Sequence, residues 1–184
     1  MRCATVLLLP WLAAAAWAQP ASVTFDGERY AKRFDNRTAA GRVVEYTREG
    51  ESLADWTRLV AVRHFPQQSD PRAAAAQLAQ TVRQHNPQAR AEVIARPDGS
   101  EAIVDFLTWA PGDDRLEFNV HRYRREPGTA GLVAWQFAWR FRSAELADPT
   151  ATVRAHRKRF VDAMANAQWP SAFARPLAPG PAPR

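Results

Sequence analysis

Two polar residues on one predicted strand are the best candidates for acid–base chemistry. Glu117 and His121 fall on the same face of the strand expected over residues 115–125. A carboxylate beside an imidazole can orient the ring and raise its basicity, as general acid–base catalysis requires. Asp55 and His64 offer a weaker pair of the same kind. Neither pair has a nucleophile at a diagnostic spacing, so a hydrolase-like enzyme is the alternative rather than the leading interpretation.

The aromatic stripe of residues 132–142 predicts which side chains face one another across a hairpin. If this strand and the strand of residues 115–125 are joined by a symmetric loop, the numbers of every facing pair add up to 257. One face is then continuously apolar, and we expect it to be buried against a helix. On the reverse face the same register predicts two polar pairs: Glu117 with Arg140, and His121 with Gln136.

The apolar face of this hairpin becomes basic toward its loop. Arg122 is predicted opposite Trp135, and Arg124, two residues later on the same face, is predicted opposite Val133. A guanidinium group can stack on an indole ring, and such stacking can simply cover the edge of a core. The functional alternative is that Arg122, Arg124 and Trp135 form the rim of an opening that binds an anionic or amphipathic ligand.

Common catalytic and metal-binding motifs are missing from the sequence. It has no Gly-rich phosphate loop, HExxH pair, Gly-x-Ser-x-Gly motif or EF-hand series. The four histidines fall in different predicted elements and lack the close spacing of paired metal ligands. We therefore expect neither a metal site nor a cofactor. The histidines are His64, His85, His121 and His156.

The N-terminus has the features of a secretory signal peptide. Arg2 supplies positive charge, residues 4–16 are almost entirely apolar, and small residues at Ala16 and Ala18 predict cleavage before Gln19. A membrane anchor is the alternative, but the uncharged stretch is shorter than the ~20 apolar residues of a spanning helix. Removal of residues 1–18 leaves a 166-residue mature chain without a transmembrane segment. We expect the protein to be periplasmic or secreted.

The composition limits the possible partners and chemistries. The only cysteine is Cys3, so the mature chain has no disulfide, thiol nucleophile or thiolate ligand. The formal net charge is +6, and four basic residues crowd the segment Arg154–Arg159. An anionic envelope polymer could bind there through salt-sensitive contacts, although no specific nucleic-acid motif is present.

The remaining pattern predicts a single α+β domain over residues 19–170, followed by a disordered Pro-rich tail over residues 171–184. Its fold is an antiparallel sheet with a four-stranded meander, packed by two main helices. Asp-Pro pairs mark both helix starts, and Pro-Gly turns separate the meander strands. The expected elements are a hairpin of residues 22–34 and 42–47 with its turn at 35–37, a helical turn at 51–56, a strand at 59–65, a helix at 71–85, meander strands at 91–95, 101–109, 115–125 and 132–142, and a helix at 149–168.

Two resemblances add to this interpretation. The segment from Glu45 to Leu59, which contains Gly-Glu-Ser-Leu-Ala-Asp-Trp-Thr-Arg-Leu, resembles a segment of uncharacterised secreted proteobacterial proteins. The order of elements resembles the Mog1/PsbP-type α/β sandwich. Neither resemblance implies an activity for any residue here. We expect an exported, non-catalytic binding or accessory domain of the bacterial cell envelope, whose partner is an unknown small molecule or envelope component.

Overall fold

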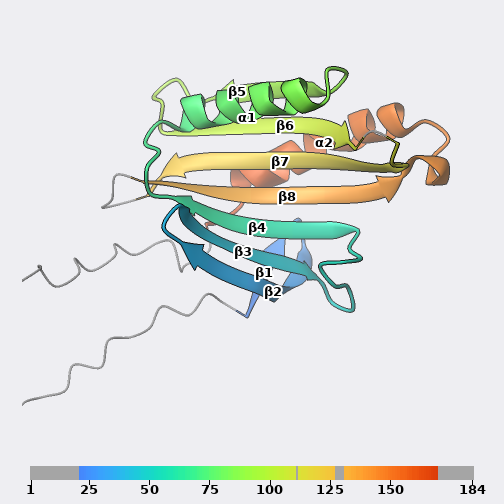
Figure 1. Cartoon of the computed structure of the whole chain (residues 1–184), viewed down its shortest axis with the longest axis horizontal. Helices are drawn as coiled ribbons and strands as arrows, with labels where there is room; N and C mark the ends of the chain where they lie inside the picture. Colours follow the sequence, from blue (N-terminus) through green and yellow to red (C-terminus); the bar gives the residue numbers. More distant parts are fainter. Residues whose placement is uncertain (1–20, 111, 127–130, 170–184) are drawn as a thin grey trace, which may run out of the picture.

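The computed structural model describes residues 21–110, 112–126 and 131–169, which form one eight-stranded sheet and two α-helices (Figure 1). The elements in chain order are β1 (Ser22–Phe25), β2 (Glu28–Thr38), β3 (Gly41–Arg48), β4 (Arg58–Phe65), α1 (Pro71–His85), β5 (Arg90–Ala95), β6 (Glu101–Trp109), β7 (Arg115–Arg125), β8 (Leu132–Arg142), a short 3-10 turn (Ser143–Glu145) and α2 (Pro149–Asn166).

All neighbouring strands are antiparallel, in the order β1-β2-β3-β4-β8-β7-β6-β5. The predicted α+β class and the β5–β8 meander are therefore confirmed. The predicted register between β7 and β8 is also confirmed, because Arg122 lies opposite Trp135 and Arg125 lies opposite Leu132. Long, regular strands on both sides of one loop leave little freedom for a shift in register.

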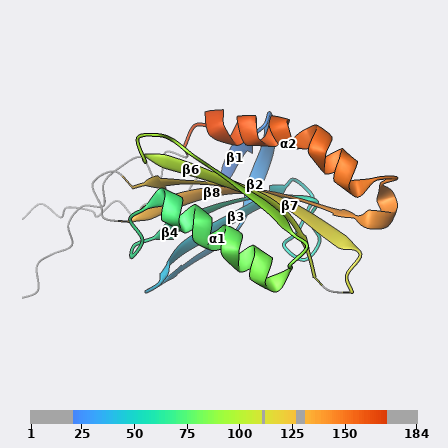
Figure 2. The same ribbon diagram turned by 90° about the horizontal axis from the view of Figure 1, so that it is seen from above.

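The two helices cover opposite faces of the sheet (Figure 2). The N-cap residue of α1 is Asp70, whose carboxylate accepts hydrogen bonds from two backbone amides of the first turn. Small residues such as Ala75 and Ala79 let α1 lie close to β5, β6 and β7. On the other face, Phe160 and Met164 of α2 pack into the main hydrophobic core.

The sheet curls strongly toward the α2 face. The rings of Phe25 in β1 and Phe137 in β8 stack with their centroids 4.7 Å apart. Three strands lie between β1 and β8, so in a flat sheet these strands would be ~19 Å apart at ~4.8 Å per strand. The concave face therefore encloses the aromatic core, and the α1 face is the convex one.

Three local predictions were wrong. Residues 22–34, expected as one arm of the first hairpin, form two strands: β1, and the first part of β2, joined by a turn at residues 26–27. Residues 35–37 continue β2 instead of forming a turn, and the chain reverses later, at residues 39–40. Within the longer strand pair, Asp35 forms an ion pair at 2.8 Å with Arg42 on β3. The expected helical turn at residues 51–56 is a bend. Its cap-like hydrogen bond between Ser52 Oγ and the amide of Asp55 forms, but no helix follows.

Predictions for the two ends of the chain concern residues outside the described part. These are the signal peptide of residues 1–18 and the Pro-rich tail of residues 171–184. Within residues 21–110, 112–126 and 131–169, no helix is long and apolar enough to span a membrane.

Candidate functional site

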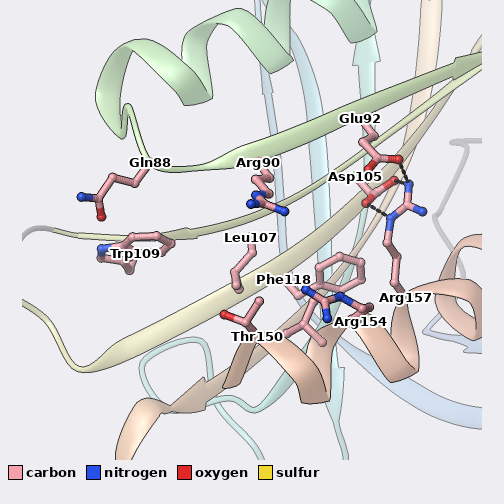
Figure 3. A pocket seen from close by; sticks show the side chains of 11 residues that line it. Gln88, Arg90, Glu92, Asp105, Leu107, Trp109, Phe118, Thr150, Arg154 and Arg157 are labelled. Atoms are coloured by element: carbon pink, nitrogen blue, oxygen red, sulfur yellow. Dashed lines mark hydrogen bonds and ion pairs between the residues drawn. The ribbon is translucent and has the colours of Figure 1, made fainter. Parts of the chain in front are cut away.

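A pocket of about 400 Å³ lies on the concave face, between the first half of α2 and strands β5 and β6 (Figure 3). We call it the α2 pocket. Its lining combines an apolar floor with charged and polar side chains from both sides. The lining residues are Gln88, Arg90, Glu92, Asp105, Leu107, Trp109, Phe118, Thr150, Val153, Arg154 and Arg157.

One end of the α2 pocket is closed by an ion-pair cluster that joins the helix to the sheet. Asp105 is only 4% exposed and receives two hydrogen bonds of 2.7 Å from the Nε and Nη2 atoms of Arg157. The same guanidinium group also contacts Glu92 on β5. Burial raises the pKa of Asp105, and the paired guanidinium group only partly opposes this effect. The cluster is a structural bridge between α2, β5 and β6.

Two further arginines of the pocket have no such partner. Arg90 lies on the strand side and Arg154 on the helix side (Figure 3). Neither forms an ion pair or side-chain hydrogen bond with the residues that the structure describes, whereas Arg157, one turn after Arg154, is fully engaged. Thr150, in the first turn of α2, also borders the pocket. The unpaired positive charge at this site favours an anionic group.

The rest of the lining places an apolar surface beside free positive charge. Leu107, Trp109, Phe118 and Val153 form an apolar surface beside the two free guanidinium groups. None of the eleven lining residues is a histidine, cysteine or serine. The pocket therefore offers positive charge next to an apolar surface.

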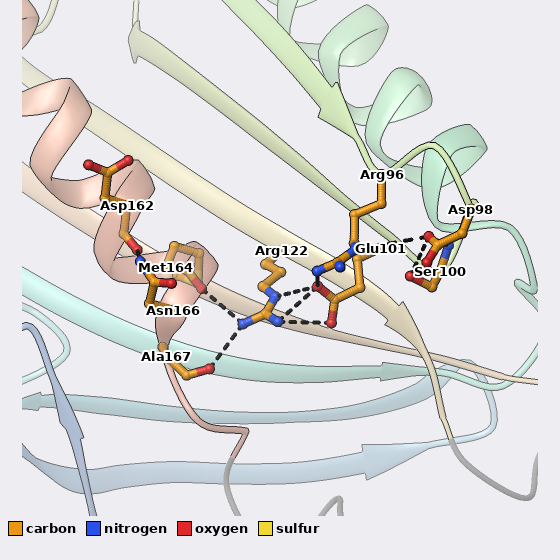
Figure 4. A network of polar contacts seen from close by, with 9 residues as sticks. All are labelled: Arg96, Asp98, Ser100, Glu101, Arg122, Asp162, Met164, Asn166 and Ala167. Carbon is orange, nitrogen blue, oxygen red and sulfur yellow. Dashed lines mark hydrogen bonds and ion pairs between the residues drawn. The ribbon is translucent and has the colours of Figure 1, made fainter.

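The predicted ligand residue Arg122 lies at the centre of another network (Figure 4). It is 8% exposed and forms a bidentate pair with Glu101, whose closest distances are 2.8 Å. Its Nη1 atom also donates to the carbonyl oxygens of Met164 and Ala167 at 3.1 and 3.0 Å. A guanidinium group is well suited to satisfying carbonyls at a helix C-terminus. The geometry gives Arg122 a structural role, which ties α2 to β7.

The other two predicted rim residues lie next to Arg122, around a tryptophan that follows α2. The Arg124 guanidinium group lies 4.2 Å from the centroid of the Trp169 ring, and the Arg122 group lies 5.2 Å from it. Trp135 is 2% exposed, and its ring centroid is 6.1 Å from that of Trp169. Trp169 thus covers this edge of the core. Ligand binding by Arg122, Arg124 and Trp135 stays a prediction.

The structure does not bring Glu117 and His121 together. Glu117 forms the predicted ion pair with Arg140, at 3.2 Å, and accepts a hydrogen bond from Asn119, which lies between the two residues. His121 and Gln136 are register partners, but no hydrogen bond joins them, and Gln136 donates to Asn119 instead. Glu117 and His121 also line separate hollows of the convex face. Direct acid–base cooperation of this pair has no geometric support.

Sequence reasoning missed the α2 pocket because its charged residues come from three separate elements. The available signals were Arg90 and Glu92, which share one face of β5, and Arg154 and Arg157, which share one face of α2. The long-range pairing with Asp105 is not visible in the sequence. Among the described residues, no three histidine, cysteine or acidic side chains cluster closely enough to hold a metal ion.

One of two comparisons with known proteins gives a match for this chain. No curated protein matches the chain. A protein-family model matches residues 17–169, which include every described helix and strand. The chain therefore belongs to this family, which is uncharacterised.

Proposed function

We propose that this protein is a non-catalytic binding domain of the bacterial cell envelope, and that its ligand is a small amphipathic anion held in the α2 pocket. The observation that carries the proposal is the pair Arg90 and Arg154. Both line one pocket, and neither has a carboxylate partner among the described residues.

The dimensions and chemistry of the pocket support this ligand class. A volume of about 400 Å³ lies within the range of small-molecule sites, which is roughly 300 to 1,000 Å³. Guanidinium groups bind carboxylates and phosphates through two parallel hydrogen bonds. The apolar floor around Leu107 and Phe118 suits a short hydrocarbon portion next to the anionic group.

Location in the periplasm or outside the cell is part of the proposal. Its support is the basic start, apolar run and small-residue cleavage signal of residues 1–18, together with the resemblance of residues 45–59 to secreted proteobacterial proteins. The resemblance to a Mog1/PsbP-type sandwich rests on element order. It adds no ligand to the proposal.

The two alternative functions find less support in the geometry. A hydrolase-like site at Glu117 and His121 would need the two side chains in one cleft, and they line different hollows. A polymer-binding face on α2 would need free cations. Three of the four basic residues of the segment Arg154–Arg159 are paired with carboxylates: Arg157 with Asp105 and Glu92, Lys158 with Asp162, and Arg159 with Asp26. The fourth, Arg154, has no such partner among the described residues, but it lines the α2 pocket.

Calorimetric titration with decanoate tests the proposal, with decanol as the uncharged counterpart. We expect decanoate to bind, and Arg90→Gln or Arg154→Gln to weaken it at least tenfold, because each change removes one cation from the site. Arg72→Gln, on the exposed side of α1, is the matched control and should leave binding unchanged. Equal binding of decanol, or equal affinity in all variants, would refute the assignment.

A further inference from the structure

A second hollow lies on the convex face, where α1 ends its coverage of the sheet. The helix packs on β5, β6 and β7, while β8 and β4 continue beyond it. A groove of about 340 Å³ runs along this edge, and we call it the α1 groove. The α1 groove and the α2 pocket lie on opposite faces of the sheet. Successive side chains of a strand point to opposite faces, so the two sites use different residues of each strand. The two sites are therefore independent.

The feature that points to a ligand is His121. Its side chain is 7% exposed and its Nδ1 atom is buried without a hydrogen-bond partner. Neither ring nitrogen forms a hydrogen bond with the described residues. Its ring stacks between Phe106 and Tyr123, with centroid distances of 5.7 and 6.1 Å, so it cannot easily turn toward another partner. Buried polar atoms in native proteins are almost always satisfied, and an exception needs an explanation.

The groove around His121 is lined mainly by neutral hydrogen-bonding groups. Gln77 and Thr81 face it from α1, and Gln68 faces it from the segment before the helix. None of these three side chains has a hydrogen-bond partner among the described residues. Arg63 is the one charged residue in the lining, and its guanidinium group already contacts Glu45 and Gln136.

We infer that the α1 groove is a binding site for a neutral, polyhydroxylated ligand, a saccharide, with His121 at its base. A neutral imidazole offers one donor and one acceptor, which is also what a sugar hydroxyl offers. Amide and hydroxyl side chains at the rim supply further partners of the same kind. The lining lacks the free cations that distinguish the α2 pocket, so an anion is disfavoured here.

The aromatic rings in the groove exclude a second ligand type. His121 and Tyr123 stand nearly parallel, at 14°, with centroids 6.1 Å apart. A flat ligand inserted between them needs about 7 Å, which is two van der Waals separations. Planar heteroaromatic molecules therefore cannot be sandwiched, and recognition must use hydrogen bonds to the ring edges and the rim. Burial also keeps His121 neutral, because it lowers the pKa to about 3.

Titration of ¹⁵N-labelled protein with two trisaccharides tests the inference by NMR. Maltotriose represents a free sugar, and triacetylchitotriose represents an amino-sugar polymer of the cell wall. At millimolar concentrations, we expect at least one of them to shift the amide signals of His121, Tyr123 and residues 77–81. The trisaccharide that binds identifies the source of the ligand. If neither shifts these signals at 50 mM, or if the shifts map to the α2 pocket, the inference is wrong.

Variants separate a site in the α1 groove from a general effect on the fold. His121→Phe should weaken saccharide binding at least tenfold, since the ring remains but both nitrogens are lost. Gln77→Ala, at an exposed helix position that cannot unfold the core, should weaken it severalfold. Arg154→Gln is the matched control, and it should leave saccharide affinity unchanged. Unaltered affinity in His121→Phe and Gln77→Ala would overturn the inference, whatever the result for decanoate.

Discussion

His121→Phe should make this protein more resistant to acid, although it replaces a buried polar residue. The imidazole forms no hydrogen bond with the described residues, so the phenyl ring loses none. It keeps the stacking on Phe106 and Tyr123. At pH 7 we expect the free energy of unfolding to change by less than about 1 kcal/mol, as is usual for an aromatic replacement of similar volume.

The effect of acid follows from the pKa of His121. Burial, assisted by the nearby positive charge of Arg63, lowers this pKa from 6.5 to about 3. Between these two values the unfolded chain binds a proton that the native protein does not, so stability falls as the pH falls. At pH 4.5 the loss from this one group is about 3 kcal/mol, from ~1.36 kcal/mol per pH unit over two units. The phenylalanine variant does not have this loss.

Urea unfolding followed by tryptophan fluorescence, at pH 7 and at pH 4.5, measures the difference. The carboxylates titrate in both proteins, so their contribution cancels when the two pH differences are subtracted. Gln77→Ala, a change at an exposed position of α1 that removes no titratable group, is the control and should leave the pH dependence unchanged. The reasoning is refuted if the phenylalanine variant loses as much stability at pH 4.5 as the wild type. An NMR titration that places the His121 pKa near 6 would refute it too.

Two further predictions concern the arginine networks. Glu101→Ala should lower the free energy of unfolding by about 2–3 kcal/mol in a denaturant titration, because it leaves the buried Arg122 guanidinium without its carboxylate. Asp98→Ala, at an exposed position just before Glu101, should have a much smaller effect. Asp105→Asn should alter the pH dependence of stability in the opposite sense to His121→Phe: burial raises the pKa of Asp105, so the native state holds its proton longer, and stability falls as the pH rises above the ordinary carboxyl value. The wild type should therefore lose stability relative to this variant between pH 4 and pH 7, and a gain would contradict the assignment.

The positions of most elements could be predicted because local signals mark their ends. Asp70-Pro71 and Asp148-Pro149 begin the two helices at the predicted residues. Proline and glycine stand in the sequence between the meander strands, and they predicted where each strand begins and ends. The turn between β1 and β2 was harder to predict. It lies at Asp26-Gly27 and uses two consecutive residues with positive φ, 49° and 78°, in a segment with no proline.

The candidate site could not be predicted, because it depends on contacts between distant residues. Asp105 and Arg157 are 52 residues apart, and nothing in either local sequence selects that partner. The curl of the sheet is also a property of all its strands together, and it decides which face encloses the core. The sequence did predict correctly that Arg122 and Trp135 face each other across one hairpin. It did not reveal that the backbone carbonyls of Met164 and Ala167 engage the guanidinium group.

The two arginine networks also fix elements that line the α2 pocket. Arg122 fixes the C-terminal end of α2 to β7, and Arg157 fixes an earlier turn to Asp105 on β6. Arg154 is three residues before Arg157, on the same side of the helix, so the anchored helix holds it at the pocket. Arg90 is held at the pocket by the sheet. Both guanidinium groups line the same pocket, and like charges near each other repel. An anion bound between them replaces this repulsion with two attractions, whereas a neutral ligand leaves it in place.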